Sequence, residues 1–283
     1  SRVAAVAAKH GRPVTSHIRG EGRSVAGRDL FNSNVTVRAT VTDPGENVRS
    51  SGLYQVYYQV LVNGEDWTSQ VAVSGKGSVK SAGVIGYGTS GQDYESAGAV
   101  DEPITSQDVI DFGFDANTFN YNDVKIYVWA EDNSGNVLQK SEAVHYFFGI
   151  DITDPTIEVR YDNNDAQNEK YFKEDRTATI TVTERNFDPN STKITTESNA
   201  ISSWTYQPGS MANGDDDKWI CTVAYTEDGD YTFDVTTTDL VGHRAAGADY
   251  GDSVAPREFT VDKTSPIIHI TFDNNDVRNG KYY

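Results

Sequence analysis

The strongest constraint on the fold of this chain is an internal repeat. Residues 151–165 read DITDPTIEVRYDNND, and residues 262–276 read DKTSPIIHITFDNND. Between 151 and 171, eleven of 21 positions are identical to the residue 111 positions further along. A unit of that length is too long for a solenoid repeat and suits one sandwich domain. Because the second copy runs only from 262 to 283, we expect the chain to be a piece of a longer array of domains.

A weaker similarity connects the first part of the chain to the second. Residues 124–136 and 231–243 each combine an alternating strand pattern with an Asp-x-x-Gly turn, in which glycine supplies a positive φ. A final strand follows each turn and leads into Asp-x-Thr-x-Pro, which places domain boundaries at 150/151 and 261/262. The sequence therefore predicts four parts: residues 1–28, a basic linker or the tail of a preceding module; 29–150, a domain with a long insertion rich in Gly and Tyr; 151–261, a second domain; and 262–283, the first strand of a further domain.

The hydrophobic pattern inside these units has a period of two residues. Segments such as 35–41 and 177–182 alternate, and they are separated by clusters of Asn, Asp, Gly and Pro. Only residues 105–112 resemble a helical turn. Several short strands in about 110 residues indicate an all-β chain of tandem immunoglobulin-like β-sandwiches. The aromatic residues that fall on strand positions are expected in the core, as is the single cysteine: Trp129, Phe148, Trp219, Phe233 and Cys221.

Composition excludes several classes of protein. The chain has 24 basic and 42 acidic residues, a net charge of −18, although residues 1–28 alone carry +5. An acidic surface repels nucleic acid and anionic lipid. No run of 18 apolar residues exists, so we expect no direct membrane insertion. One cysteine excludes an intrachain disulfide framework and a multi-cysteine zinc site.

These motifs together resemble a known family. The combination of Asp-x-Thr-x-Pro, Tyr-Asp-Asn-Asn-Asp, Lys-Tyr-Phe, Arg-Thr-Ala-Thr-Ile-Thr-Val-Thr-Glu-Arg-Asn-Phe-Asp and Asp-x-x-Gly is similar to the bacterial immunoglobulin-like repeats of large surface proteins of Gram-positive gut bacteria. The resemblance covers roughly residues 30–283 and is most specific in 151–261. His243 departs from the usual Asn after Asp-x-x-Gly. The resemblance implies an extracellular protein of the bacterial cell wall or surface, adhesin-like, without catalytic residues.

The residues themselves also give no enzymatic signal. The five histidines never pair at metal-ligand spacing, and none follows a nucleophile elbow. Paired carboxylates are so frequent in this acidic chain that no single pair indicates general acid–base chemistry. We therefore expect no enzyme and no organic cofactor.

Calcium is the metal that the sequence favours. Asp-Asn-Asn-Asp places hard oxygen ligands near each predicted domain hinge, with a further aspartate just upstream. The same tetrapeptide is also a good turn whose side chains cap their own backbone. The candidate calcium ligands are Asp151, Asp162, Asp165, Asp262, Asp273 and Asp276.

A second stabilising device is an internal Lys–Asn isopeptide bond, which occurs in Gram-positive surface sandwiches. Such a bond needs a lysine and an asparagine on adjacent strands with a buried carboxylate between them. Lys170, Asn186 and Glu184 are a possible set, although no spacing fixes them. The alternative is that Lys170 lies at the start of a strand with its charge in solvent.

Two loop regions are candidates for ligand binding. Residues 75–103 combine glycines with tyrosines, a composition found in adaptable recognition loops. Residues 198–218 contain two large aromatic side chains between turn residues. The candidate contact residues are Tyr87, Asp93, Tyr94, Trp204 and Tyr206. The alternative is that both regions fold back as long hairpins with these aromatic rings packed down.

The resemblance implies a non-catalytic segment of a bacterial cell-surface protein, and together with the candidate loops it predicts binding of a host protein through a loop or an exposed edge strand. Host immunoglobulin is one candidate ligand, and neighbouring repeats of the same chain are further partners. Two alternatives remain. The repeats could be a structural stalk or spacer, stiffened by calcium, or a module that binds host glycans beside a glycan-degrading enzyme.

Overall fold

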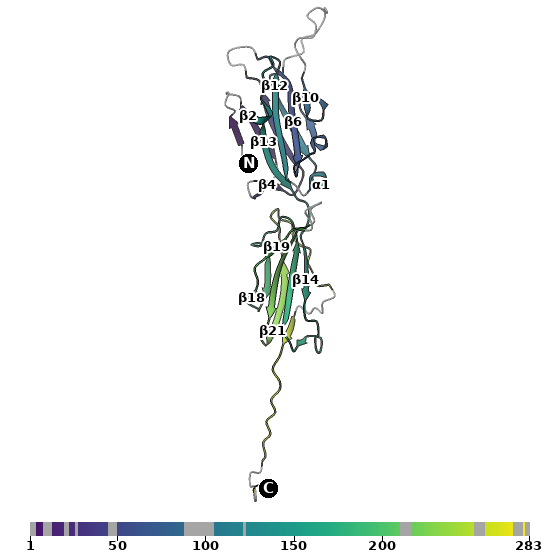
Figure 1. Cartoon of the computed structure of the whole chain (residues 1–283), viewed down its shortest axis with the longest axis vertical. Helices are drawn as coiled ribbons and strands as arrows, with labels where there is room; N and C mark the ends of the chain where they lie inside the picture. The colour runs from purple at the N-terminus through teal and green to yellow at the C-terminus, as the bar shows by residue number, and fades with distance from the viewer. Residues whose placement is uncertain are drawn as a thin grey trace, which may run out of the picture.

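The computed structural model describes residues 4–7, 13–19, 23–25, 28–44, 50–87, 105–120, 123–209, 217–251, 258–273 and 280. Two β-sandwiches lie end to end, and residues 262–273 extend away from the second along the same axis (Figure 1). The described residues up to 150 build the first sandwich, and those from 156 to 261 build the second.

The second sandwich shows the strand order most clearly. One sheet has the order β18-β20-β16-β14-β22, with β19 also on β20, and the other has the order β15-β23-β21-β17. Strand β14 is antiparallel to β16, whereas the short β15 is parallel to β23. In immunoglobulin nomenclature β14, β16, β20 and β18 are strands A, B, E and D, and β15, β23, β21 and β17 are strands A′, G, F and C. The strands are β14 (Thr156–Tyr161), β15 (Tyr171–Phe172), β16 (Arg176–Thr183), β17 (Lys193–Thr196), β18 (Ala200–Ile201), β19 (Thr205–Gln207), β20 (Lys218–Tyr225), β21 (Gly229–Thr236), β22 (Ala248–Asp249) and β23 (Glu258–Val261).

The first sandwich repeats this order with additions. Its sheets are β1-β2-β5-β11-β8 and β3-β4-β13-β12-β6-β10-β9, with β7 also on β6. The strands are β1 (Ala4–Ala7), β2 (Pro13–Arg19), β3 (Arg23–Val25), β4 (Arg28–Phe31), β5 (Val35–Thr42), β6 (Leu53–Val62), β7 (Glu65–Asp66), β8 (Ala72–Ser74), β9 (Ser78–Ser81), β10 (Val84–Gly86), β11 (Gln107–Phe114), β12 (Val124–Asp132) and β13 (Val144–Ile150). Again β2 is antiparallel to β5, and β4 is parallel to β13. The chain is therefore a tandem of immunoglobulin-like β-sandwiches, as the sequence predicts.

The period of two residues is the reason that these strands form sandwiches. Along β5 and β16 every second side chain is buried, so one face of each strand enters the core and the other remains accessible. Phe148 and Phe233 lie in the two cores as expected, and Cys221 is buried. Trp129 differs, because it lies on the outer face of β12, where its ring stacks on Tyr57.

The predicted helical turn at 105–112 is wrong. Residues 107–114 form β11, whose inward positions carry Ile110, Phe112 and Phe114. Asp108 shares this inward face, and a polar residue on the buried side obscures the alternation. The helix of this region is α1 (Ala116–Phe119), which begins after Asp115, whose carboxylate accepts from the backbone N–H groups of Asn117 and Thr118. Two 3₁₀ turns occur at Thr68–Gln70 and Lys140–Glu142.

The described backbone of residues 1–28 is strand rather than linker. Strand β2 pairs with β5 over five residues, and β3 pairs with β4. The described parts of residues 1–28 therefore extend both sheets of the first sandwich. Glycine and serine in this segment suggest a linker, but the neighbouring edge of β5 offers backbone partners that composition does not reveal.

Candidate functional site at the domain junction

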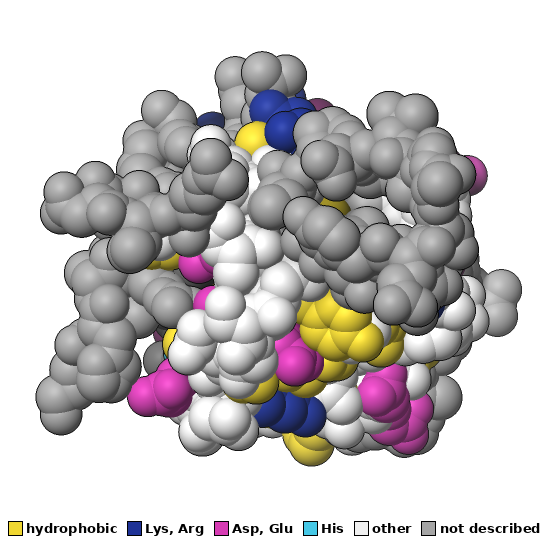
Figure 2. All heavy atoms as spheres, turned by 90° about the horizontal axis from the view of Figure 1, so that it is seen from above, with side chains coloured by type: hydrophobic (Ala, Val, Ile, Leu, Met, Phe, Trp, Pro, Cys, Tyr) yellow, Lys and Arg dark blue, Asp and Glu magenta, His cyan; other side chains and the backbone are white. Residues whose placement is uncertain are grey.

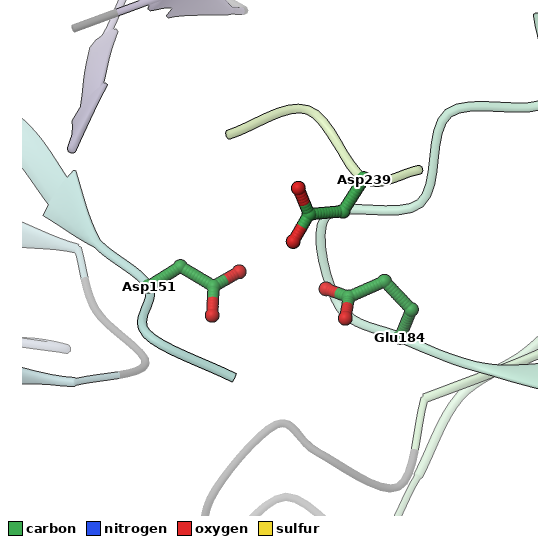
Figure 3. A group of neighbouring side chains, drawn as sticks. All are labelled: Asp151, Glu184 and Asp239. Carbon is green, nitrogen blue, oxygen red and sulfur yellow. The ribbon is translucent and has the colours of Figure 1, made fainter. Parts of the chain in front are cut away.

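Three buried carboxylates meet where the two sandwiches join. Asp151, Glu184 and Asp239 are 3%, 3% and 1% exposed, and each offers an oxygen within 4.8 Å of the others. Figure 3 shows the three side chains pointing toward one another, Asp151 from one side and the other two from the opposite side. We call these three residues the junction cluster.

The cluster is assembled from both sandwiches by the ends of strands. Asp151 directly follows β13, the last strand of the first sandwich, and Glu184 directly follows β16 of the second. Asp239 opens the Asp-x-x-Gly turn after β21, where Gly242 has a φ of 100°. A positive φ at this position favours glycine, because a Cβ atom would strain the backbone. The three carboxylates thus come from the residue after the last strand of the first sandwich and from two strand ends of the second.

Backbone donors hold Asp239 in place. Its Oδ1 accepts from the N–H groups of Val241 (2.9 Å), Gly242 (2.6 Å) and His243 (2.8 Å). The Nδ1 atom of His243 lies 3.1 Å from Oδ2. Burial nevertheless raises the pKa of Asp239 above its ordinary value, since a charge removed from water is disfavoured.

Asn186 links the other two carboxylates. Its Nδ2 donates to Asp151 Oδ2 at 2.5 Å, and its backbone N–H donates to Glu184 Oε1 at 2.6 Å. Asp151 Oδ1 also accepts from the N–H of Thr153 at 3.0 Å. These contacts orient the cluster with donors that are neutral, so they do not cancel its negative charge.

Further hydrogen bonds cross from the first sandwich to the linker and the second sandwich. Asn120, at the end of α1, accepts from Ile152 N at 3.0 Å and donates to Thr153 Oγ1 at 3.1 Å. Asn32 Nδ2 donates to the carbonyl of Val241 at 3.3 Å. The linker, residues 151–155, is thus hydrogen-bonded to the first sandwich. The carboxylate of Asp151 lies beside Glu184 and Asp239 of the second sandwich.

The donor set suits a hard divalent cation. All three side chains offer carboxylate oxygens, and calcium takes six to eight oxygen ligands from such groups. Neither sulfur nor a histidine nitrogen belongs to the cluster, so softer metals such as zinc fit it less well. Asp151, Glu184 and Asp239 are therefore the described residues that could hold a metal ion, and calcium is the best match.

At the end of the first sandwich that lies away from the junction, carboxylates occupy the positions equivalent to Glu184 and Asp239. Among the described residues, no third carboxylate joins these two. Asp43 follows β5 as Glu184 follows β16, and Asp132 opens the other Asp-x-x-Gly turn. Asp43 Oδ2 accepts from Ser50 Oγ, Ser51 Oγ and Gly52 N at 2.8–3.2 Å. Asp132 Oδ2 accepts from Asn136 Nδ2 at 2.8 Å, in the place that His243 takes at Asp239.

The structure separates the predicted calcium ligands. Asp151 lies before β14, whereas Asp162 and Asp165 are exposed in the turn after it, at the other end of the sandwich. Asp162 Oδ1 accepts from Thr177 N at 2.6 Å, and Asn163 O accepts from Arg176 Nε at 2.9 Å. This turn holds the fully buried guanidinium of Arg176, and a positive charge there opposes a cation.

The remaining predicted ligands do not form a site in the described residues. Asp262 and Asp273 are exposed, and Asp276 lies outside the described residues. The predicted isopeptide set is also separated: Glu184 and Asn186 lie at the junction, and Lys170 is exposed beside Thr260, near the far end of the sandwich.

Tyr87 does not offer a contact surface, contrary to the prediction. Its side chain is 8% exposed, and its hydroxyl donates to the buried Asp108 at 2.8 Å. The ring packs down because the buried carboxylate gives its hydroxyl a partner inside the sandwich. Asp93 and Tyr94 lie outside the described residues.

The two aromatic candidates of the second sandwich differ from each other. Trp204 is partly buried and packs edge-on against Phe187, with ring centroids 4.9 Å apart. Tyr206, on the edge strand β19, is 47% exposed and lies 4.9 Å from the ring of Trp219. Of the predicted contact residues that are described, Tyr206 alone presents an accessible ring.

Sequence reasoning named Asp151 but missed its two partners in the cluster. The sequence indicates a turn residue at Asp239 and an isopeptide candidate at Glu184, and it assigns neither to the hinge. The available signal was positional: the turn after the F strand and the end of the B strand lie at the same end of an immunoglobulin sandwich, next to the preceding domain.

Comparisons with known proteins give structural likeness only. No protein-family model matches the sequence, and a comparison with curated proteins finds no match. Among solved structures, the C-terminal domain of the AgI/II polypeptide BspA of Streptococcus agalactiae is similar with a TM-score of 0.31 and 10% identity, over 88% of this chain and 99% of that one. A marsupial T cell receptor is similar with a TM-score of 0.28 and 9% identity, over 77% of this chain and 56% of that one. The fold assignment rests on the strand order given above.

Two surface properties complete the description. Within the part of the chain that the structure describes, no helix is long and apolar enough to cross a membrane. Asp and Glu side chains appear at several places in the view along the long axis (Figure 2), in keeping with the net charge of −18.

Proposed function

We propose that this chain is a non-catalytic segment of a bacterial cell-surface protein, in which calcium at the junction cluster fixes the two sandwiches into an extended rod. The observation that carries the proposal is the origin of the three carboxylates: Asp151 directly follows the last strand of the first sandwich and its N–H donates to Phe31 of that sandwich, whereas Glu184 and Asp239 belong to the second. A cation bound by all three neutralises buried negative charge and bridges the domains at once.

The surface location rests on the sequence resemblance to bacterial immunoglobulin-like repeats. A rod of such domains holds binding surfaces away from the cell wall. The burial of Tyr87 and the packing of Trp204 favour this spacer role over a ligand-binding loop at those two residues.

Calcium binding is tested by isothermal titration of the metal-free chain. We expect one site, with a Kd of about 0.1–1 mM as in other extracellular modules. Calcium at 100 times Kd then stabilises the folded chain by about 2.7 kcal/mol. Asp239→Asn and Glu184→Gln abolish both effects, whereas Asp165→Asn, the matched control in the exposed turn, leaves them unchanged. Equal binding by wild type and Asp239→Asn would contradict the proposal.

A host-protein ligand is a second candidate, favoured by the exposed ring of Tyr206. Strand β19 lies at a sheet edge, and Ile201 of the neighbouring β18 is also exposed. Edge strands bind extended partners through backbone hydrogen bonds, and flanking side chains add selectivity. The test is binding of purified human immunoglobulin to the immobilised chain. We expect binding that Tyr206→Ala weakens at least tenfold and that Val79→Ala, an exposed residue of β9, does not. Absence of binding removes immunoglobulin as the ligand.

A further inference from the structure

The segment after the second sandwich exposes side chains that belong in a core. Residues 262–273 contain no strand and run away from β23 (Figure 1). Ile268, Ile270 and Phe272 are 84%, 72% and 64% exposed. Large apolar side chains exposed to this degree at three alternate positions mark a contact surface rather than ordinary surface scatter.

The repeat identifies what these side chains correspond to. At the offset of 111 residues they match Ile157, Val159 and Tyr161 of β14, which are 3%, 0% and 6% exposed. The intervening His269 and Thr271 match residues on the accessible face of β14. Over residues 268–272 the segment therefore has the alternation of the first strand of a sandwich.

The start of the segment, at Asp262, makes the same hydrogen bonds as the start of the first linker, at Asp151. Asp262 N donates to the carbonyl of Phe172 at 2.9 Å, as Asp151 N does to Phe31 at 2.9 Å. Thr264 N donates to Asp262 Oδ1 at 3.1 Å, and the equivalent bond at Asp151 is 3.0 Å.

After the second sandwich, the carboxylate of Asp228 takes the role that the side chain of Asn120 has at the first linker. Asp228 accepts from Lys263 N at 2.9 Å and from Thr264 Oγ1 at 2.5 Å, the two linker positions that Asn120 binds in the first sandwich. Lys263 Nζ also donates to Asp175 Oδ1 at 2.9 Å. Equivalent hydrogen bonds from a side chain to two successive linker residues thus set the direction in which the chain leaves each sandwich.

From these correspondences we infer that residues 267–272 donate the first strand to a further immunoglobulin-like sandwich, and that Asp262 is the upstream carboxylate of a second junction. The partner is defined by its chemistry. It presents a second strand that alternates like β16, followed by a glutamate, and an Asp-x-x-Gly turn at the same end. Only the role of Asp262 rests on the proposed function; strand donation does not require calcium.

The test extends the full chain by a copy of residues 173–261 placed after Tyr283, so that residues 262–283 stand where 151–172 stand in the second sandwich. A perfect-duplicate control carries residues 151–172 in place of 262–283. Both are studied in chelator by hydrogen exchange and calorimetry, so that the result is independent of any cation.

We expect the amides of 268–272 to exchange at unprotected rates in the original chain and at least 100-fold more slowly in the extended chain. The extended chain also gains an unfolding transition. Ile270→Asp removes the added transition and the protection, whereas Thr271→Asp, on the accessible face, retains both.

Two results would overturn the inference. One is a duplicate control that folds while the extended chain with residues 262–283 does not. The other is an Ile270→Asp variant with full protection. Calcium added afterwards tests the second junction separately: Asp262→Asn lowers the number of bound ions by one, and a failure of that arm alone leaves strand donation intact.

Discussion

Replacement of Arg176 tests the physical account of the Asp-Asn-Asn-Asp repeat. The guanidinium is fully buried, and its central carbon lies 3.6, 4.1 and 4.6 Å from the ring centroids of Tyr161, Phe172 and Phe259. Nε donates to the carbonyl of Asn163 at 2.9 Å. Burial lowers the pKa of Arg176 to about 10, so the side chain remains charged at neutral pH.

The size of the effect follows from these contacts. A desolvated cation–π contact contributes about 2 kcal/mol, and a hydrogen bond to a charged group about 1.5–3 kcal/mol. The cost of desolvating the guanidinium offsets part of this sum. Arg176→Ala also leaves a cavity, so we expect a loss of about 3–5 kcal/mol. Arg176→Met fills much of the space but leaves the Asn163 carbonyl without its donor, a loss of about 1–3 kcal/mol.

The assay is urea denaturation together with calorimetry. A loss of 3 kcal/mol lowers the Tm of a domain of this size by roughly 12–24 °C. Asp162→Asn, which keeps an oxygen acceptor for Thr177 N, serves as the control in the same turn. A loss below about 1 kcal/mol for Arg176→Ala would refute the reasoning. So would a change in calcium affinity at the distant junction cluster.

Three further predictions concern Tyr87, His243 and the buried tyrosines. Tyr87→Phe removes the hydroxyl that donates to buried Asp108, and we expect a loss of about 1.5–3 kcal/mol in chemical denaturation. His243→Asn preserves a donor near Asp239 and leaves the Tm nearly unchanged, whereas His243→Leu costs about 0.5–1.5 kcal/mol; equal Tm values for the two variants would contradict this. Stability falls as pH rises above about 10, since burial raises the pKa of four tyrosines, so the unfolded chain loses those protons first. Arg176 has the opposite effect for one proton, because burial lowers its pKa and the folded chain loses that proton first. A free energy of unfolding that rises from pH 10 to 12 would contradict the prediction. The tyrosines are Tyr87, Tyr146, Tyr161 and Tyr225, the last with a pKa of about 12.

The sandwich fold could be predicted because its signals are local and repeated. Alternation along β5 and β16, the Asp-x-x-Gly turns and the offset of 111 residues all lead to the same architecture. Gly135 and Gly242 have φ values of 80° and 100°, as the turn chemistry requires. The helical turn predicted at 105–112 is wrong because a buried polar residue, Asp108, interrupts the hydrophobic alternation of β11.

The junction cluster could be predicted only in part. Asp151 stands out beside the hinge, but Glu184 and Asp239 lie 33 and 88 residues further along the chain. Their meeting depends on how the second sandwich docks onto the first, which local patterns do not encode. The Asp-Asn-Asn-Asp turn misled for a related reason, because its partner is the guanidinium of Arg176, and sequence spacing does not show which charge a turn surrounds.

The most direct test of the account measures whether calcium fixes the joint. Spin labels at Ser81→Cys in the first sandwich and Lys193→Cys in the second lie on exposed strand positions, and the native Cys221 is buried, with a pKa raised by burial. Electron–electron double resonance then gives the distribution of distances between the two sandwiches. The account predicts a broad distribution in chelator that narrows to one distance in calcium, and no narrowing in Asp239→Asn. A distribution that is equally narrow with and without calcium, or that narrows in Asp239→Asn as in wild type, would contradict it.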